Sequence, residues 1–143
     1  MDQKLKLSVL AVVIALLTSP AWSQARKTKL IDHSSSALID AASAKQVMSD
    51  NLPDRVLKLY PAGKFAFVSQ VEGGITSGGA CVVTARVMLL PLTATMKAVL
   101  LRPQKMATAF DSLPGASMDQ CKGVARDKLK EATTSVVAAL VKS

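Results

Sequence analysis

Residues 1–25 have the layout of a secretory signal peptide, and this decides which residues are left to fold. Lys4 and Lys6 precede a mostly apolar run, Leu7–Leu17, and the small residues Ala21, Ser23 and Ala25 follow it. A basic segment, an apolar core and small residues before a cleavage point are what signal peptides share. We expect cleavage after Ala25, or alternatively after Ser23, and a folded protein formed by residues 26–143.

An uncleaved membrane anchor is the alternative to cleavage. A helix needs about 20 apolar residues to cross a bilayer, whereas the apolar run that begins at Leu7 ends at Leu17. The first cysteine of the chain is Cys81, so no cysteine stands at the cleavage point to be acylated. We therefore expect export to the periplasm or the exterior of the cell.

The chain has two cysteines, Cys81 and Cys121. In an oxidising compartment, an even pair in a small exported domain is expected to form a disulfide. Closing a loop of this length would stabilise the fold by roughly 4 kcal/mol. A redox pair is the alternative, but catalytic dithiols of the familiar kind lie two residues apart. We predict one disulfide-stapled domain over residues 26–143.

The N-terminal part of this domain is predicted to hold one short helix. The polar, basic segment Arg26–His33 is predicted to be a loose arm. Ser34–Ser36 offers an N-cap for a helix that reaches about Ser49 and has a modest apolar face. Residues 55–60 fit either a short strand or a helical turn.

The middle of the chain changes to a strand pattern. Apolar residues alternate along Phe65–Val71, which is typical of a strand with one buried face. A glycine-rich stretch at residues 72–79 predicts a hairpin with a loop longer than two residues. Further strands are predicted at Cys81–Leu90, Met96–Leu101 and Met106–Phe110. We expect an antiparallel meander of three to four strands.

The C-terminal segment predicts a long helix. Ser117 and Gln120 have the spacing of a capping box. In this motif each side chain accepts a hydrogen bond from a backbone N–H that the first turn of the helix would otherwise leave unpaired. The apolar residues that follow recur every three or four positions: Cys121, Ala125, Leu129, Ala132, Val136 and Leu140. Such a stripe is suited to covering one face of an antiparallel sheet. The predicted fold class is α+β, with the meander covered by this helix and accompanied by a shorter N-terminal helix.

The charge balance is basic. The whole chain has a formal net charge of +8, and a small basic domain is drawn to anionic lipids, glycans or acidic proteins. Lys122, Arg126 and Lys130 lie on a face of the C-terminal helix away from the apolar stripe. They are either a solvated face or a contact for an anionic partner. Aromatic residues make up 3% of the chain, too few for nucleic-acid binding by base stacking.

The sequence gives little support for catalysis. The single histidine, His33, lies in the polar arm, and no nucleophile-elbow pattern accompanies it. No metal-ligand spacing is present, so we expect neither a metal nor a cofactor. A pair of carboxylates for glycoside cleavage would have to come from Glu72, Asp111 and Asp119.

The glycine-rich stretch is the one loop with a composition suited to contact. Its central residues are Gly73, Gly74, Ile75, Thr76 and Ser77. A phosphate-binding loop requires a helix after it, whereas here a strand is predicted to follow. Loops on rigid sheets often carry binding function, so we interpret these residues as a candidate contact loop.

Three functions remain. The leading one is a small, non-catalytic exported protein that binds another envelope or secreted protein, as an inhibitor, an immunity-type protector or an accessory subunit. The first alternative is binding of anionic lipid or glycan through the basic helix face. The second is a hydrolase with paired carboxylates. A homodimer is also left open, because a short meander can expose a strand edge.

Overall fold

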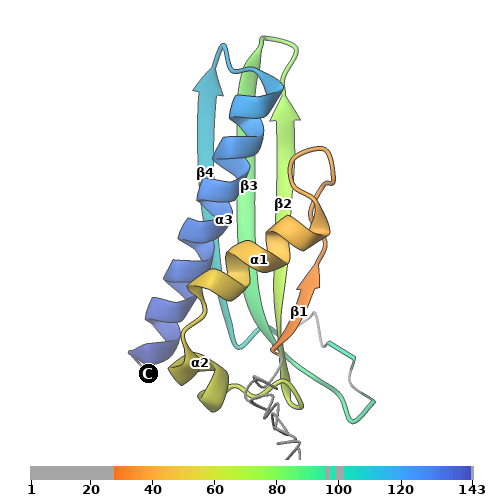
Figure 1. The fold of residues 1–143 in the computed structure, drawn as a ribbon, viewed down its shortest axis with the longest axis vertical. Coiled ribbons are helices and arrows are strands. Elements are labelled where there is room, and N and C mark those ends of the chain that lie inside the picture. The colour runs from red at the N-terminus through yellow and green to blue at the C-terminus, as the bar shows by residue number, and fades with distance from the viewer. Residues whose placement is uncertain (1–27, 96, 99–101, 143) are drawn as a thin grey trace, which may run out of the picture.

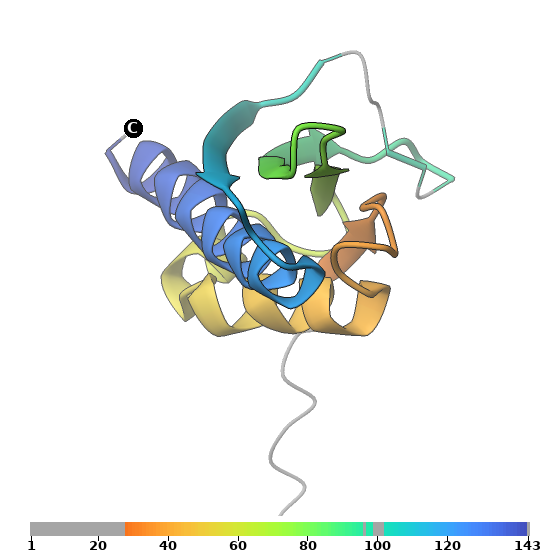
Figure 2. The same ribbon diagram turned by 90° about the horizontal axis from the view of Figure 1, so that it is seen from above.

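A computed structural model describes residues 28–142, except residue 96 and residues 99–101. These residues form one four-stranded sheet with helices on one of its faces (Figures 1 and 2). The elements are, in chain order, β1 (Lys29–Asp32), α1 (Ala41–Asn51), α2 (Asp54–Leu59), β2 (Phe65–Ile75), β3 (Ala80–Pro91), β4 (Lys105–Pro114) and α3 (Met118–Val141). The expected signal peptide lies outside the described residues.

The sheet has the order β1-β2-β3-β4. β2, β3 and β4 form an antiparallel meander, and β1 pairs parallel to β2. The α+β class and the antiparallel meander under a long C-terminal helix are confirmed. The predicted Met96–Leu101 strand falls partly outside the described residues, and its described part contributes only an isolated bridge between Leu92 and Ala98.

The N-terminal arm was expected to be loose, and this expectation is wrong for β1. Leu30 is aligned with Phe67 and packs against the core. A strand of four residues gives almost no periodic signal, and this one is held by a partner far along the chain. Its position therefore depends on tertiary pairing rather than on local sequence.

A polar network fastens the end of β1 to β2. One oxygen of the Asp32 carboxylate accepts hydrogen bonds from the hydroxyls of Ser34 and Ser69, each at 2.6 Å. The Ser34 hydroxyl in turn accepts from the backbone N–H of Val71 at 2.9 Å. Because Ser69 is fully buried, its hydroxyl needs this acceptor.

Replacing Asp32 by alanine is expected to lower the free energy of unfolding by about 1–3 kcal/mol, because the Ser69 hydroxyl loses its acceptor inside the protein. Urea denaturation followed by circular dichroism measures the change. The matched control is Asp50→Ala, since Asp50 is exposed and accepts one side-chain hydrogen bond, from Gln46. Equal effects of the two substitutions would contradict a special role for the network.

Helix α1 begins later than the serine run predicted. Its N-cap is Asp40, whose carboxylate accepts from the backbone N–H of Ser43 at 2.8 Å. The Ser43 hydroxyl and amide stabilise the ionised form and lower the pKa of Asp40. Leu38 and Ile39 are buried ahead of the helix, and this anchors the serine segment in a non-helical path.

The ambiguous segment at residues 55–60 is resolved as the short helix α2. Val56 is fully buried, whereas Leu59 is 54% exposed. Tyr60 follows the helix and meets Phe65 edge to face, with ring centroids 5.3 Å apart. This contact joins the end of α2 to the start of β2.

Helix α3 matches its prediction closely. Ser117 and Gln120 form the capping box, and all six residues of the predicted stripe are buried. Thr133 is also buried, and its hydroxyl donates to the carbonyl of Leu129 at 2.7 Å. The stripe lies on β3 and β4, and α1 packs beside α3 on the same face of the sheet (Figure 2).

Candidate functional site

The β2–β3 turn lies at the narrow end of the molecule (Figure 1). The structure places Gly73, Gly74 and Ile75 in the last part of β2, so only Thr76 and Ser77 of the predicted contact loop lie in the turn. The backbone N–H of Thr76 donates to the carbonyl of Ala80 at 2.8 Å and closes the turn. The loop is therefore shorter and more regular than its glycine content predicted.

Gly73 has a structural reason to be glycine. Its φ is 129°, and an added Cβ would lie 1.9 Å from the carbonyl oxygen of Val82 on β3. Gly74 also has a positive φ, 150°, but its Cβ would meet nothing within 4 Å. The close approach of β2 to β3 at Gly73 thus excludes any side chain.

A disulfide fixes the start of α3 to the start of β3. Cys81 and Cys121 are joined with a Cα–Cα distance of 5.5 Å, and both are fully buried. Because Cys121 lies in the first turn of α3, the bond holds the β4–α3 connection against the hairpin end of the sheet. This end of the protein is consequently rigid.

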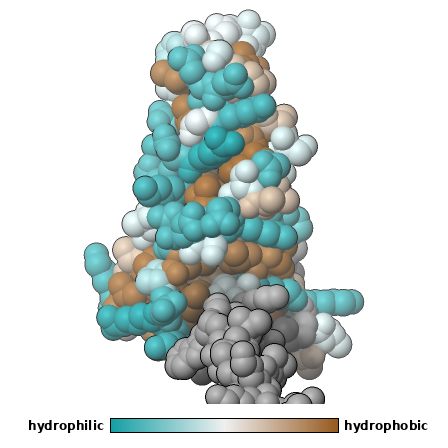
Figure 3. All heavy atoms as spheres, viewed as in Figure 1, coloured by the Kyte–Doolittle hydropathy of each residue, from teal (hydrophilic) through white to brown (hydrophobic). Residues whose placement is uncertain are grey.

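Three exposed apolar residues are neighbours of the two cysteines in the sheet and in α3. Ile75 and Leu113 are the partners of Cys81 on either side of it in the sheet, and Met118 precedes Cys121 by about one helical turn. Their exposed fractions are 37% for Ile75, 39% for Leu113 and 43% for Met118. We call these three residues the apolar tip. Figure 3 shows hydrophobic residues reaching the surface at this narrow end.

Of these three residues, Ile75 was predicted from the sequence as a contact residue, whereas Leu113 and Met118 were not. Met118 continues the apolar stripe of α3 toward the helix N-terminus by one turn beyond Cys121, and this spacing was visible in the sequence. Leu113 could not be found in that way, because its position beside Cys81 depends on the β3–β4 register.

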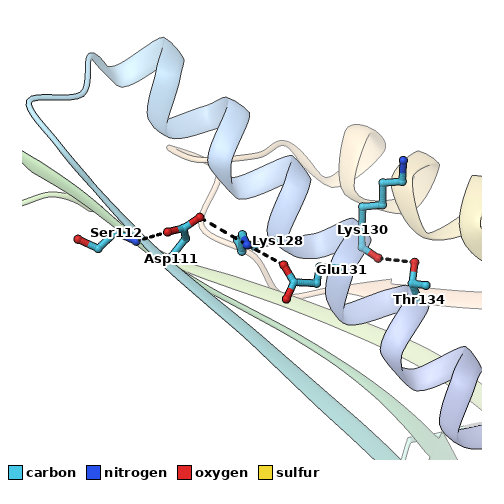
Figure 4. A network of polar contacts seen from close by, with 6 residues as sticks. All are labelled: Asp111, Ser112, Lys128, Lys130, Glu131 and Thr134. Atoms are coloured by element: carbon cyan, nitrogen blue, oxygen red, sulfur yellow. Dashed lines mark hydrogen bonds and ion pairs between the residues drawn. The ribbon is translucent and has the colours of Figure 1, made fainter.

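The three cations of the predicted basic face lie one turn apart along α3. Lys122 is partly buried, and Arg126 and Lys130 are exposed. Within the part of the chain that the structure describes, none of the three forms an ion pair. Lys130 extends away from the sheet in Figure 4, and acidic residues Asp127 and Glu131 alternate with the cations along the helix.

Lys128 was not singled out from the sequence, and it links α3 to the sheet. Its ammonium lies 2.6 Å from the Glu131 carboxylate and 3.4 Å from that of Asp111 on β4 (Figure 4). The hydrogen bond to Glu131 and the two negative charges raise the pKa of Lys128. These contacts fasten the outer side of the helix to β4.

The structure does not bring the three candidate carboxylates together. The register puts Asp111 on the helix-covered face of the sheet and Glu72 on the opposite face. Glu72 accepts a hydrogen bond from Gln70, and Asp119 is exposed in the first turn of α3. His33 is exposed just after β1. Among the described residues, no group of three or more histidines, cysteines and carboxylates is placed to hold a metal ion.

None of the described helices has both the length and the apolar character needed to span a bilayer.

The chain is distantly similar to a solved structure. No protein-family model matches the chain, and no curated protein matches it. A solved structure described as a "putative lipoprotein" from Caulobacter crescentus CB15 aligns over 79% of this chain and 85% of its own, with 11% sequence identity and a TM-score of 0.37. At this level the similarity supports no inference about function.

Proposed function

We propose that this chain is a small exported protein of the cell envelope that acts by binding another protein, and that the apolar tip is its docking surface. The signal-peptide layout of residues 1–25 and the disulfide between Cys81 and Cys121 support export to an oxidising compartment. Binding, rather than catalysis, is the activity we assign to it.

The observation that carries the proposal is the exposure of three apolar side chains at one rigid end. Clustered exposed apolar residues mark interaction sites more often than scattered ones do. The Cys81–Cys121 disulfide and the β2–β3 turn hold the tip in place before a partner arrives, so little conformational entropy is lost on binding. The partner chemistry that fits is an apolar protein surface.

Substitution at the tip tests the proposal. Purified residues 26–143, with the disulfide formed, are immobilised and exposed to envelope extract, followed by washing at low and then high salt. We expect one stoichiometric protein to resist high salt and to be lost from the double variant Ile75→Asp, Met118→Asp. The matched control is Leu59→Asp on α2, because Leu59 is more exposed than any tip residue and lies far from the tip.

Two results would contradict docking through the tip. In the first, the tip variant and the Leu59→Asp control retain the same partner equally well. In the second, no protein is retained by the unsubstituted domain under either wash. Circular dichroism spectra of the variants show whether each has kept its fold.

The row formed by Lys122, Arg126 and Lys130 supports a second candidate, binding of anionic lipid or glycan. These three cations lie one turn apart, and none of them forms an ion pair with another described residue. Binding of this kind is screened by salt. We expect vesicles with anionic lipid to retain the protein at low salt only, and alanine at all three positions to abolish retention. Retention that persists in high salt would argue against this surface.

A further inference from the structure

The outer strand β4 has an open edge. It pairs with β3 on one side, and no described strand pairs with it on the other. Exposed edges are usually protected by charges, prolines or short length. The centre of this one, Met106–Phe110, has no charged residue and no proline. Met106 is 52% exposed and Phe110 is 62% exposed.

The hydrogen-bond pattern shows which backbone groups face the open edge. The N–H of Gly115 donates to the carbonyl of Gly79 at 3.0 Å, in the same ladder that pairs Ala80 with Pro114. Antiparallel partners alternate between hydrogen-bonded and non-hydrogen-bonded pairs. The odd-numbered residues of β4 therefore bond to β3. Met106, Thr108 and Phe110 direct their N–H and C=O groups to the edge, whereas the N–H of Ser112 donates to the Asp111 carboxylate at 2.8 Å.

We propose that β4 pairs with β4 of a second copy of this chain, antiparallel, about a twofold axis at Thr108. In this register Met106 lies opposite Phe110 of the second copy, and the twofold axis repeats the pair. Lys105 lies opposite Asp111 of the second copy, also twice. The edge-facing backbone groups of Met106, Thr108 and Phe110 in both strands then bond to each other, and the two sheets join into one.

Other registers lose this complementarity. An axis at Ala109 sets Lys105 opposite Leu113. An axis at Ala107 sets Lys105 opposite Ala109. Neither brings Met106 to Phe110. In one register, both the apolar pair and the charged pair are self-complementary. This favours a second copy of the chain as the partner of β4.

The apolar pair is expected to supply most of the affinity. Lys105 and Asp111 lie near the surface, where an ion pair contributes little, and Asp111 already contacts Lys128. Their part is to set the register, because a slip would take Lys105 away from the carboxylate of the second copy. Burial of Met106 against Phe110 removes the two most exposed apolar side chains of β4 from water.

Cysteine cross-linking tests the register. In a hydrogen-bonded antiparallel pair the Cα atoms lie about 5.5 Å apart, within reach of a disulfide. We expect Thr108→Cys to form a covalent dimer under mild oxidation. The control is Ser112→Cys, on the same edge but about 27 Å from its counterpart in this register, and it should remain uncross-linked.

Equal cross-linking at the two positions, or none at position 108, would overturn the register. Peptide mapping without reductant verifies in each variant that the Cys81–Cys121 bond is intact. The experiment does not involve the apolar tip, so its failure and the failure of the proposed function are separate results.

Sedimentation equilibrium tests the dimer itself. The unsubstituted domain is expected to be dimeric at micromolar concentration. Phe110→Lys should weaken the dimer by about tenfold or more, since burying such a side chain contributes about 1.5–3 kcal/mol and 1.4 kcal/mol is a factor of ten. Leu59→Lys, the matched control on α2, should leave it unchanged. A monomer at all concentrations, or equal dimerisation of the two variants, would refute the proposal.

Discussion

Replacing Cys81 and Cys121 together by serine is expected to lower the free energy of unfolding by about 4 kcal/mol. The two residues are 40 apart in sequence, so the bond restricts a long loop in the unfolded chain. That restriction, and not the contacts of the two sulfur atoms, is the main source of the stabilisation in the chain-entropy model. Many small domains have total stabilities of only 5–15 kcal/mol, so the loss is large.

The measurement is urea denaturation of the double variant and of the unsubstituted domain, with and without reductant. The reduced domain serves as the control, because it retains both cysteine side chains and lacks only the bond. Both forms should be destabilised by a similar amount. A loss below about 1 kcal/mol in each would show that packing of α3 on the sheet holds this end without the bond.

The second large effect is expected from Gly73→Ala. The added methyl group would lie 1.9 Å from the carbonyl oxygen of Val82, so β2 and β3 would have to separate locally. Together with the positive φ, this should lower the free energy of unfolding by about 3 kcal/mol or more. Thermal and urea unfolding measure the change.

Gly74→Ala is the matched control for this prediction. Gly74 shares the positive φ but has open space where its Cβ would lie. Only the backbone strain applies there, and we expect a loss of about 1–2 kcal/mol. If the two variants were equally stable, the clash with Val82 would be relieved by a small shift and the close approach would not be important.

The parts of the fold that were predictable are those whose signal is local. The stripe and capping box of α3 lie within one continuous segment, and the structure has both. The alternation along Phe65–Val71 likewise belongs to one strand, β2. The start of α1 was misplaced because serines can cap a helix or bond elsewhere, and Ser34 bonds to Val71 of β2 instead.

The candidate sites also combine residues that have a local sequence signal with residues that are placed by strand pairing. Ile75 and Met118 stand beside recognisable sequence features, a glycine-rich turn and the end of an apolar stripe. Their proximity to Leu113 follows from strand register, which arises from pairing across the sheet. The open edge of β4 is likewise a property of strand order, and no pattern within residues 105–114 shows that β4 is the last strand.

Both ends of the folded domain lie opposite the apolar tip, and this determines where the protein can be attached to a surface or a label. Lys29 is aligned with Ala66 near the start of β2, whereas Ile75 ends that strand, about 30 Å away at the usual rise per residue. Helix α3 begins near Cys81 and ends at the far end of the molecule (Figure 1). A linker, a fluorescent label or a sensor surface attached at Lys29 or at Lys142 would therefore leave Ile75 facing outward. A pulling force applied between these two residues would act on one end of the molecule only.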